Sequence, residues 1–441
     1  MKVLISGTAA GDGWPAPGCE CASCTRLAPG HRRPTDVVLT DPAPPPPTGP
    51  TPALGRLPPT EPTPDAPIQP APAKPTSDGP VRSAPGETAE PASDEPVRPA
   101  PTEPAPAELV RLPPAVPLPP GYRTSTGPDG LTLTAPNGER ILYAASLPSP
   151  PPGRYGERNG RGPSSASTED SPDPAYTNSA PDPAPAEDAR STYGLVLMDV
   201  LDRPERLGDL RRRGVVGERT HVVAVDIDHR VPTEAELARR TAFWGVRAVP
   251  DGTVLDTDGP VPAPPTRPRR TLVLGGTRSG KSAEAELRLA AEPEVLYVAT
   301  GPSGDGDAEW GRRVRAHRER RPAHWGTAET TDLAGLLRAA EIPMLIDGLG
   351  TWIAAVFDAC DAWSGDGREA VTARCDELVA AWRQVRVPVV AVSDEVGLGV
   401  VPATSSGRMF RDALGRLNQR LALESEDVAL VVAGRVLPLP V

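Results

Sequence analysis

The stretch that decides the fold is residues 271–290, TLVLGGTRSGKSAEAELRLA. The apolar run 272–274 has the length of a buried strand, and residues 283–290 are rich in the good helix formers Ala, Glu and Leu. Between them lies the spacing G-x-x-x-x-G-K-S, which is typical of a phosphate-binding loop when it joins a strand to a helix. The stretch therefore predicts that the chain binds a nucleoside triphosphate.

Each residue of this loop has an expected role. The glycines let the backbone curl so that consecutive N–H groups, and the N-terminus of the next helix, face phosphate oxygens. Lys281 can reach the β- and γ-phosphates, and the Ser282 hydroxyl suits Mg²⁺. We expect eight nucleotide contacts here: Gly275, Gly276, Thr277, Arg278, Ser279, Gly280, Lys281 and Ser282.

Alternating strand-like and helix-like segments continue through residues 269–441. The pattern predicts an α/β domain with a parallel sheet covered by helices on both faces. Expected strands lie at 271–275, 295–299, 343–347, 388–393 and 427–433. Ligands of such sheets bind at the carboxyl ends of strands. Ala299, Thr300 and Gly301 are therefore expected beside the nucleotide, and Asp347 is expected to act with Ser282 as a Mg²⁺ ligand.

A basic segment follows the second expected strand. Residues 307–321, DAEWGRRVRAHRERR, favour a helix that ends before Pro322. Arg313, His317 and Arg321 recur at helical spacing, so they share one face. A neutral imidazole among guanidinium groups suits phosphate chemistry, whereas a solvated basic face explains the same pattern without it. The residues alone leave both interpretations open.

Composition limits the other function classes. The 441 residues predict two or three domains, but 60 Pro with only 3 Phe and 6 Tyr indicate that much of the chain cannot build a core. The net charge of −11, without a long basic run, argues against a nucleic-acid partner. We expect no membrane span and no secretion signal. Five cysteines without a disulfide pattern favour a reducing compartment, so we expect a cytoplasmic protein.

The first 258 residues predict an interrupted domain. Pro-rich composition predicts disordered insertions at 41–120 and 147–190. The folded pieces are expected at 1–40, at 121–146 and at 191–258, and residues 259–268 form a linker. Residues 131–145 predict a hairpin that turns at Asn137 and Gly138. We expect strands at 2–6, 193–202 and 221–229, and helices at 204–213 and 233–244.

Cys19, Cys21 and Cys24 form a cluster that suits a shared Zn²⁺. A fourth ligand would have to come from one of the five histidines. The alternative is a set of reduced cysteines that face solvent. The spacing C-x-C-x-x-C does not decide between the two.

The N-terminal part resembles the metallo-β-lactamase-like hydrolases, in particular the cyclic phosphodiesterase branch of phosphonate breakdown. The shared feature is the start GTxxGxG-x-P-x-x-G-C-x-C-x-x-C. The resemblance implies a structural Zn²⁺ held by Cys19, Cys21, Cys24 and His229. The catalytic string H-x-H-x-D-H is missing from the sequence; Asp199 matches a bridging acid, but Asp226 stands where a metal-binding histidine is expected. We therefore expect a degenerate, non-catalytic α/β domain.

The C-terminal part resembles the bifunctional adenosylcobinamide kinase/adenosylcobinamide-phosphate guanylyltransferase family. The resemblance rests on these motifs, in chain order: GGTRSGKS, VLYVAT, RVRAHRERRPAHWGTAE, the acid after MLI, DEVGLGVVP and FRDALGRLNQRLA. The resemblance implies that ATP or GTP phosphorylates adenosylcobinamide. GTP then guanylylates a histidine, which passes GMP to adenosylcobinamide phosphate. It also implies a homotrimer.

Matched by position, His317 is the guanylylated and catalytic histidine, with Lys281 and Asp347 as the other catalytic residues. The resemblance places further nucleotide contacts at Arg318, Glu319, Arg320, Arg321, Glu329 and Asp347. His324 is expected to be structural or to support the residues that contact the nucleotide. Three residues depart from the usual pattern: Asp394 replaces an Asn or similar residue, and Gly348 and Gly350 stand where the family often has Cys and Thr.

Two other functions stay open at this point. The chain could be a P-loop NTPase or small-molecule kinase without guanylyl transfer. It could also be a zinc-bearing scaffold in which bound nucleotide only regulates the binding of a partner.

Overall fold

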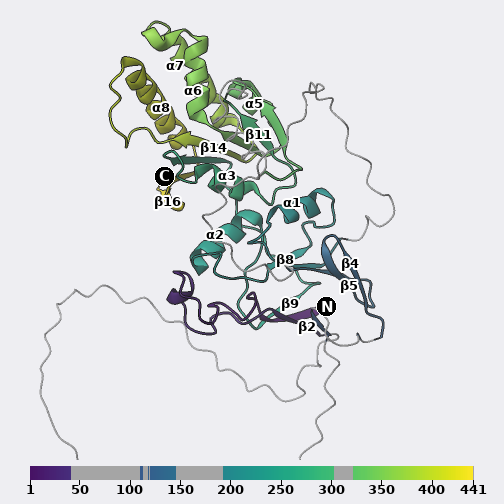
Figure 1. Cartoon of the computed structure of the whole chain (residues 1–441). Coiled ribbons are helices and arrows are strands. Elements are labelled where there is room, and N and C mark those ends of the chain that lie inside the picture. Colours follow the sequence, from purple (N-terminus) through teal and green to yellow (C-terminus); the bar gives the residue numbers. More distant parts are fainter. Residues whose placement is uncertain (41–109, 113–117, 119, 146–191, 302–320, 441) are drawn as a thin grey trace, which may run out of the picture. The chain divides into compact units, whose positions relative to one another are not determined.

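The computed structural model describes residues 1–40, 110–112, 118, 120–145, 192–301 and 321–440 (Figure 1). Most of the two expected insertions lies outside these residues. So does nearly all of the expected helix 307–321, including His317, Arg318, Glu319 and Arg320.

Two sheets form the N-terminal part. The first is antiparallel throughout, with the order β3-β2-β1-β9: β1 (Lys2–Gly7), β2 (Asp36–Thr40), β3 (Val110–Leu112) and β9 (Thr253–Asp256). The second has the order of its numbering: β4 (Arg123–Gly127), β5 (Gly130–Thr134), β6 (Arg140–Ala144), β7 (Leu195–Met198) and β8 (His221–Ala224). Strands β6, β7 and β8 are parallel, and β4 and β5 join by antiparallel pairing.

Alternating side chains of β6, β7 and β8 supply two cores. Ile141, Leu195 and Val223 pack with residues of β1, β2 and β9, so the two sheets share a buried layer. Their sequence neighbours Leu142, Val196 and others face helices α1 (Glu205–Arg212) and α2 (Glu234–Trp244). Helix α2 begins where the Thr233 hydroxyl accepts a hydrogen bond from the N–H of Glu236, and it ends at Gly245 in a left-handed conformation.

The C-terminal part contains a seven-stranded sheet with the order β12-β11-β13-β14-β10-β15-β16. All neighbouring pairs are parallel except β15 and β16. The strands are β10 (Arg270–Gly275), β11 (Leu296–Ala299), β12 (Gly326–Glu329), β13 (Met344–Asp347), β14 (Val389–Asp394), β15 (Asp427–Val432) and β16 (Arg435–Leu439).

Helices cover both faces of this sheet, as the apolar strands predict. Leu272, Ile346 and Ala391 face one core with α5 (Leu333–Arg338), α6 (Leu349–Ala359), α7 (Arg368–Gln384) and α8 (Ser405–Leu423). Figure 1 shows α6, α7 and α8 as a group. The alternate residues, among them Val273 and Leu345, face α3 (Lys281–Leu289). Two short 3₁₀ helices, η1 (Cys24–Arg26) and η2 (Ala362–Ser364), complete the elements of the described residues.

Most expected elements are confirmed. The five expected strands of the C-terminal part, the hairpin that turns at Gly138, and the helices near 204–213, 233–244 and 407–422 are all present. The structure differs from the expectations in several places. Strand β3 pairs with β2 inside the range 41–120, where only a disordered insertion was expected. β2, β4, β9, β12 and β16 were not predicted; GTAE lacks an apolar run, and Pro438 interrupts RVLPL. β7 ends at Met198 and β8 at Ala224, before the expected ends at residues 202 and 229.

No helix among the described residues is long and apolar enough to cross a membrane.

Candidate functional site

The phosphate-binding loop joins β10 to α3, as its sequence predicts. Gly275 is the last residue of β10, and a methyl group there would lie 2.5 Å from Oγ of Ser279 and 2.7 Å from the carbonyl oxygen of Val431. Gly280 precedes α3 with a φ of +101°, which favours glycine. The loop is therefore wound tightly against β15, and its curvature depends on both glycines.

The hydroxyl of Ser279 is buried inside this loop. Its oxygen has no hydrogen-bond partner among the residues that the structure describes. A buried hydroxyl without a partner is unfavourable by about 1–3 kcal/mol. The loop therefore holds a polar group that a phosphate oxygen or a water molecule would satisfy.

Lys281 and Ser282 begin α3, and both are held by acids at the carboxyl ends of strands. The ammonium nitrogen of Lys281 lies 2.9 Å from Oδ1 of Asp394 and donates to the carbonyl oxygen of Gly276 at 3.1 Å. The Ser282 hydroxyl donates to Oδ1 of Asp347 at 3.0 Å. The structure thus brings together the expected lysine and the two expected Mg²⁺ ligands.

Asp347 has a second partner that sequence reasoning missed. The hydroxyl of Tyr297, on the neighbouring strand β11, donates to its Oδ2 at 2.5 Å. Burial, and then the charge of Asp347, raise the pKa of Tyr297, so the phenol stays protonated and acts as a donor. The guanidinium of Arg321 stacks 3.4 Å above the Tyr297 ring centre. The sequence contained one sign of this partner: Tyr297 places a hydroxyl inside the otherwise apolar run VLYVA.

The other described residues that are expected to contact the nucleotide also lie at the carboxyl ends of the strands. Glu329 and Asp347 both pair in register with Ala299, so their Cα atoms stand at one level across β12, β11 and β13. The Thr300 hydroxyl donates to the carbonyl oxygen of Gly348 at 2.6 Å. Gly348 has a φ of +114°, which explains the glycine at this position. Gly301 continues this edge, and Gly276, Thr277 and Arg278 complete the loop.

His324 lies at the opposite, amino-terminal ends of the strands. It precedes the first residue of β12, and its Nε2 approaches the carbonyl oxygen of Glu292 at 3.3 Å, after the end of α3. Burial lowers the pKa of its imidazole. This position agrees with a structural role, because the phosphate-binding loop lies at the opposite ends of the strands.

A second candidate site lies in the N-terminal part. The sulfur atoms of Cys19, Cys21 and Cys24 and a ring nitrogen of His229 all lie within 4.8 Å of one another. Nδ1 of His229 is 3.6 Å from Sγ of Cys19 and 3.7 Å from Sγ of Cys24. Such separations fit a tetrahedral Zn²⁺ with metal–ligand distances of about 2.0–2.3 Å. The fold therefore brings His229 to the cysteines across about two hundred residues of sequence.

The thiols of this cluster differ in acidity. Burial opposes ionisation of Cys21, but hydrogen bonds from the N–H of Cys24 and from neighbouring thiols outweigh it and lower its pKa. Burial raises the pKa of Cys24 to about 12. The Cys21 thiol therefore ionises more readily than the Cys24 thiol.

The acids expected near a hydrolytic centre have other partners. Asp199 is buried, and its Oδ2 pairs with the Arg230 guanidinium at 2.9 Å. Its other oxygen accepts the N–H groups of Leu201 and Asp202. Asp226 accepts from the Thr35 hydroxyl at 2.9 Å and has a φ of +55°. Arg230 thus supplies the positive charge that Asp199 needs.

The C-terminal fold and its phosphate-binding site define a class: an α/β domain that binds nucleotides through a phosphate-binding loop, with acids at the carboxyl ends of β13 and β14. Residues 271–439 match the family model "Cobinamide kinase / cobinamide phosphate guanyltransferase". The chain belongs to this family.

Curated relatives agree. The chain is 44% identical over 177 residues, 38% of this chain and 96% of the relative, to the "Bifunctional adenosylcobalamin biosynthesis protein CobP" of Pseudomonas aeruginosa. It is 38% identical over 174 residues, 37% of this chain and 95% of each relative, to the proteins named "Bifunctional adenosylcobalamin biosynthesis protein CobU" in Salmonella typhimurium and Escherichia coli.

Solved structures add little. A type III secretion ATPase aligns with a TM-score of 0.25 at 13% identity, over 37% of this chain and 50% of that one. The P4 protein of bacteriophage phi6 aligns with a TM-score of 0.22 at 18% identity, over 40% and 55%. Likenesses this weak carry no argument about the fold or the function.

Proposed function

We propose that the C-terminal part phosphorylates adenosylcobinamide with ATP or GTP and then transfers GMP from GTP, through His317, to give adenosylcobinamide-GDP. The observation that carries the proposal is the joining of Lys281, Ser282 and Asp347 at one strand edge in a chain of this family. His317 lies outside the described residues, and its role rests on the match of HRERRP to the family pattern.

The described residues support binding of the triphosphate. The loop N–H groups and Lys281 would bind phosphate oxygens, and the Ser279 hydroxyl would find its partner there. The hard oxygen donors of Ser282 and Asp347, 3.0 Å apart, fit Mg²⁺. A bound Mg²⁺ would neutralise charge that develops on the transferred group. Tyr297 orients Asp347, Arg321 stacks on the Tyr297 ring, and Glu329 is at the register level of Asp347.

His317 would divide nucleotidyl transfer into two displacements. In the first, its imidazole nitrogen bonds to the α-phosphorus of GTP, and pyrophosphate leaves with the electron pair of the broken P–O bond. In the second, a phosphate oxygen of adenosylcobinamide phosphate attacks the same phosphorus and the imidazole leaves. We include Arg318, Glu319 and Arg320 among the residues that would contact GTP.

The test is intact-mass analysis of the full chain after incubation with GTP and Mg²⁺, with peptide mapping of any GMP adduct. We expect one GMP on His317, none in His317→Ala, and an unchanged adduct in the control His324→Ala. His317→Ala should still phosphorylate adenosylcobinamide, whereas Lys281→Ala should lose both steps. A wild-type chain without an adduct but with kinase activity would favour the alternative of a kinase alone. A chain without turnover would favour the nucleotide-regulated scaffold.

For the N-terminal part we propose a degenerate metallo-β-lactamase-like domain with one structural Zn²⁺. The two packed sheets with helices on an outer face, and the cluster of Cys19, Cys21, Cys24 and His229, support it. Because Arg230 already pairs with buried Asp199, a hydrolytic metal there is disfavoured. Metal analysis should find one Zn²⁺ per chain; two or more bound metals besides it would contradict the proposal.

Two further expectations belong to the proposal. The family resemblance implies a homotrimer, which light scattering of the purified chain would test. The free cysteines favour the cytoplasm, which cell fractionation would test.

A further inference from the structure

The helix that follows the phosphate-binding loop is held at its far end by the N-terminal part. Nε1 of Trp244 donates to the carbonyl oxygen of Leu287 at 2.8 Å. Arg211 donates to the carbonyl oxygen of Ala291 at 2.8 Å and to that of Trp244 at 2.7 Å. Ala291 is buried within the same core cluster as Leu207 and Leu237. The last turn of α3 and the residues after it are therefore built into the N-terminal core.

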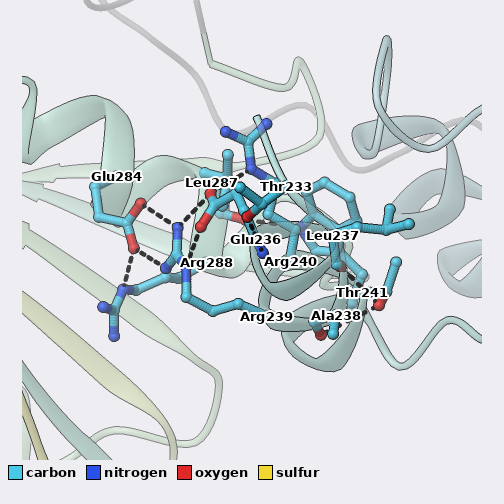
Figure 2. A network of polar contacts seen from close by, with 11 residues as sticks. Thr233, Glu236, Leu237, Ala238, Arg239, Arg240, Thr241, Glu284, Leu287 and Arg288 are labelled. Carbon is cyan, nitrogen blue, oxygen red and sulfur yellow. Dashed lines mark hydrogen bonds and ion pairs between the residues drawn. The ribbon is translucent and has the colours of Figure 1, made fainter. Parts of the chain in front are cut away.

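An ion-pair network joins α3 to α2, one turn after the phosphate-binding loop. Glu284 of α3 is 7% exposed, and Arg239 of α2 binds it with two contacts, Nη1 to Oε1 at 2.6 Å and Nη2 to Oε2 at 3.1 Å. Arg288 donates to the same Oε1 at 2.8 Å and also pairs with Asp427 at the start of β15. Figure 2 shows Glu284, Arg239 and Arg288 turned toward one another. The buried carboxylate thus depends on a guanidinium from each part of the chain.

Aromatic packing supports the two arginines. The Phe243 ring of α2 lies 5.2 Å from the guanidinium carbon of Arg239 and 4.9 Å from that of Arg288. Both guanidiniums are therefore fixed by one ring as well as by Glu284. Such a site resists displacement, because each charge has hydrogen-bond partners and a packed surface.

The turn after α3 also packs against α1, so closely that Gly208 has no room for a methyl group. A Cβ at Gly208 of α1 would lie 2.5 Å from the carbonyl oxygen of Glu292 and 3.3 Å from that of Ala290. Backbone atoms cannot move aside as a flexible side chain can. The turn after α3 is therefore seated directly against α1.

Glu284 is close to the residues that would hold the nucleotide. It follows Lys281 by three positions and Ser282 by two, which is about 3–4.5 Å along the helix axis at 1.5 Å per residue. A displacement of Glu284 would be transmitted to Lys281 and Ser282, because backbone hydrogen bonds make the helix stiff. A shift of α3 would move Ser282 relative to Asp347, which belongs to β13.

We propose that Arg239 is a positioning residue for nucleotide binding: through Glu284 it fixes α3, and with it Lys281 and Ser282. The N-terminal part is then a component of the nucleotide site. The curated relatives are covered almost end to end by 174–177 residues, so they have no room for a counterpart of this element. The inference rests on the proposed nucleotide chemistry.

The test measures binding of a non-hydrolysable GTP analogue with Mg²⁺ to the full chain by calorimetry, beside thermal unfolding. Arg239→Ala should weaken binding about 5- to 10-fold, at the lower end of typical coupling between sites. Arg239→Lys should recover part of the loss. The matched control Arg240→Ala, which pairs with Glu236 on its own helix, should bind as wild type does. Wild-type affinity in folded Arg239→Ala would overturn the proposal.

A double-mutant cycle tests the path. Glu284→Gln and Arg239→Ala should together weaken binding no more than Glu284→Gln alone, because Glu284→Gln already breaks the contact that Arg239→Ala removes. Additive losses would overturn the path through Glu284.

A second variant acts without removing a charge. Gly208→Ala should push the turn after α3 and weaken analogue binding several-fold; unchanged affinity would overturn the proposal even if Arg239→Ala fails to fold. Wild type that binds the analogue but forms no GMP adduct would contradict the proposed guanylyl transfer alone. Wild-type adduct formation with unaffected variants would contradict this inference alone.

Discussion

Oδ1 of Asp394 lies 2.9 Å from the ammonium nitrogen of Lys281, the residue expected to hold the β- and γ-phosphates. Its Oδ2 lies where a side chain at position 350 would begin, since a Cβ on Gly350 would come within 2.5 Å of it. Asp394 and Gly350, two of the three expected departures from the family pattern, therefore fit together: the glycine leaves space for the carboxylate.

This pair predicts that nucleotide must displace Asp394 from Lys281. Asp394→Asn should bind the GTP analogue with Mg²⁺ about 3- to 10-fold more tightly, because the lysine no longer leaves an ion-pair partner and repulsion of the phosphates falls. Calorimetry at fixed ionic strength would measure it. Weaker binding in Asp394→Asn would instead show that the carboxylate helps to hold the metal.

Tyr297 predicts a specific effect on the metal. Tyr297→Phe removes the hydroxyl that donates to Oδ2 of Asp347 but keeps the ring. We expect the Mg²⁺ concentration for half-maximal kinase activity to rise about 10-fold or more, since a hydrogen bond to a charged group contributes about 1.5–3 kcal/mol. The KM for adenosylcobinamide should stay the same. An equal rise in both constants would contradict a role restricted to Asp347.

The sequence predicted those features that depend on local patterns. The glycine spacing and flanking strand and helix located the loop, and the apolar runs located five strands of the sheet. The spacing C-x-C-x-x-C indicated a metal site but not its fourth ligand. His229 came from a resemblance, because nothing near residue 229 shows that the chain returns to residue 19.

The pairings across the chain could not be predicted, for a physical reason. Whether Arg239 is a surface residue or the partner of a buried glutamate depends on where α2 lies against α3, and neither helix encodes that position by itself. The weak strands β12 and β16 form because a neighbouring strand offers unpaired backbone groups, which composition does not show.

Two adjacent glycines of the loop should respond differently to the same change. Gly275→Ala places a methyl group 2.5 Å from Oγ of Ser279 and 2.7 Å from a backbone oxygen, whereas a methyl group at Gly276 meets nothing within 4 Å. Gly275→Ala should abolish detectable analogue binding and destabilise the fold by about 1–3 kcal/mol, as overpacking does. Gly276→Ala should keep the wild-type melting temperature. Equal melting temperatures for the two variants would contradict the tight turn.

Metal removal should loosen the start of α2. The Ser23 hydroxyl, inside the cysteine cluster, donates to the carbonyl oxygen of Val231, and His229 precedes the helix by few residues. Chelation, or Cys24→Ala, should lower the melting temperature by several degrees and release one Zn²⁺, because metal binding is coupled to folding. The control Cys360→Ala lies in the C-terminal part and should release none. A chain that loses its metal with unchanged melting would contradict a structural role.

Glu236 predicts an acid-dependent loss of stability in α2. Burial raises its pKa, but hydrogen bonds from Arg239 and Arg240 outweigh burial and hold the pKa below the ordinary value of 4.5. The folded state therefore binds this proton less readily than the unfolded state. Its contribution is fully present above pH 4.5 and is lost as the pH falls through the lowered value. At neutral pH, Glu236→Gln should cost about 1 kcal/mol. The difference in melting temperature between Glu236→Gln and wild type should shrink below about pH 4. Exposed Glu218→Gln serves as the control and should melt with wild type at every pH. A difference for Glu236→Gln that persists unchanged into acid would show that shape, not charge, holds the helix.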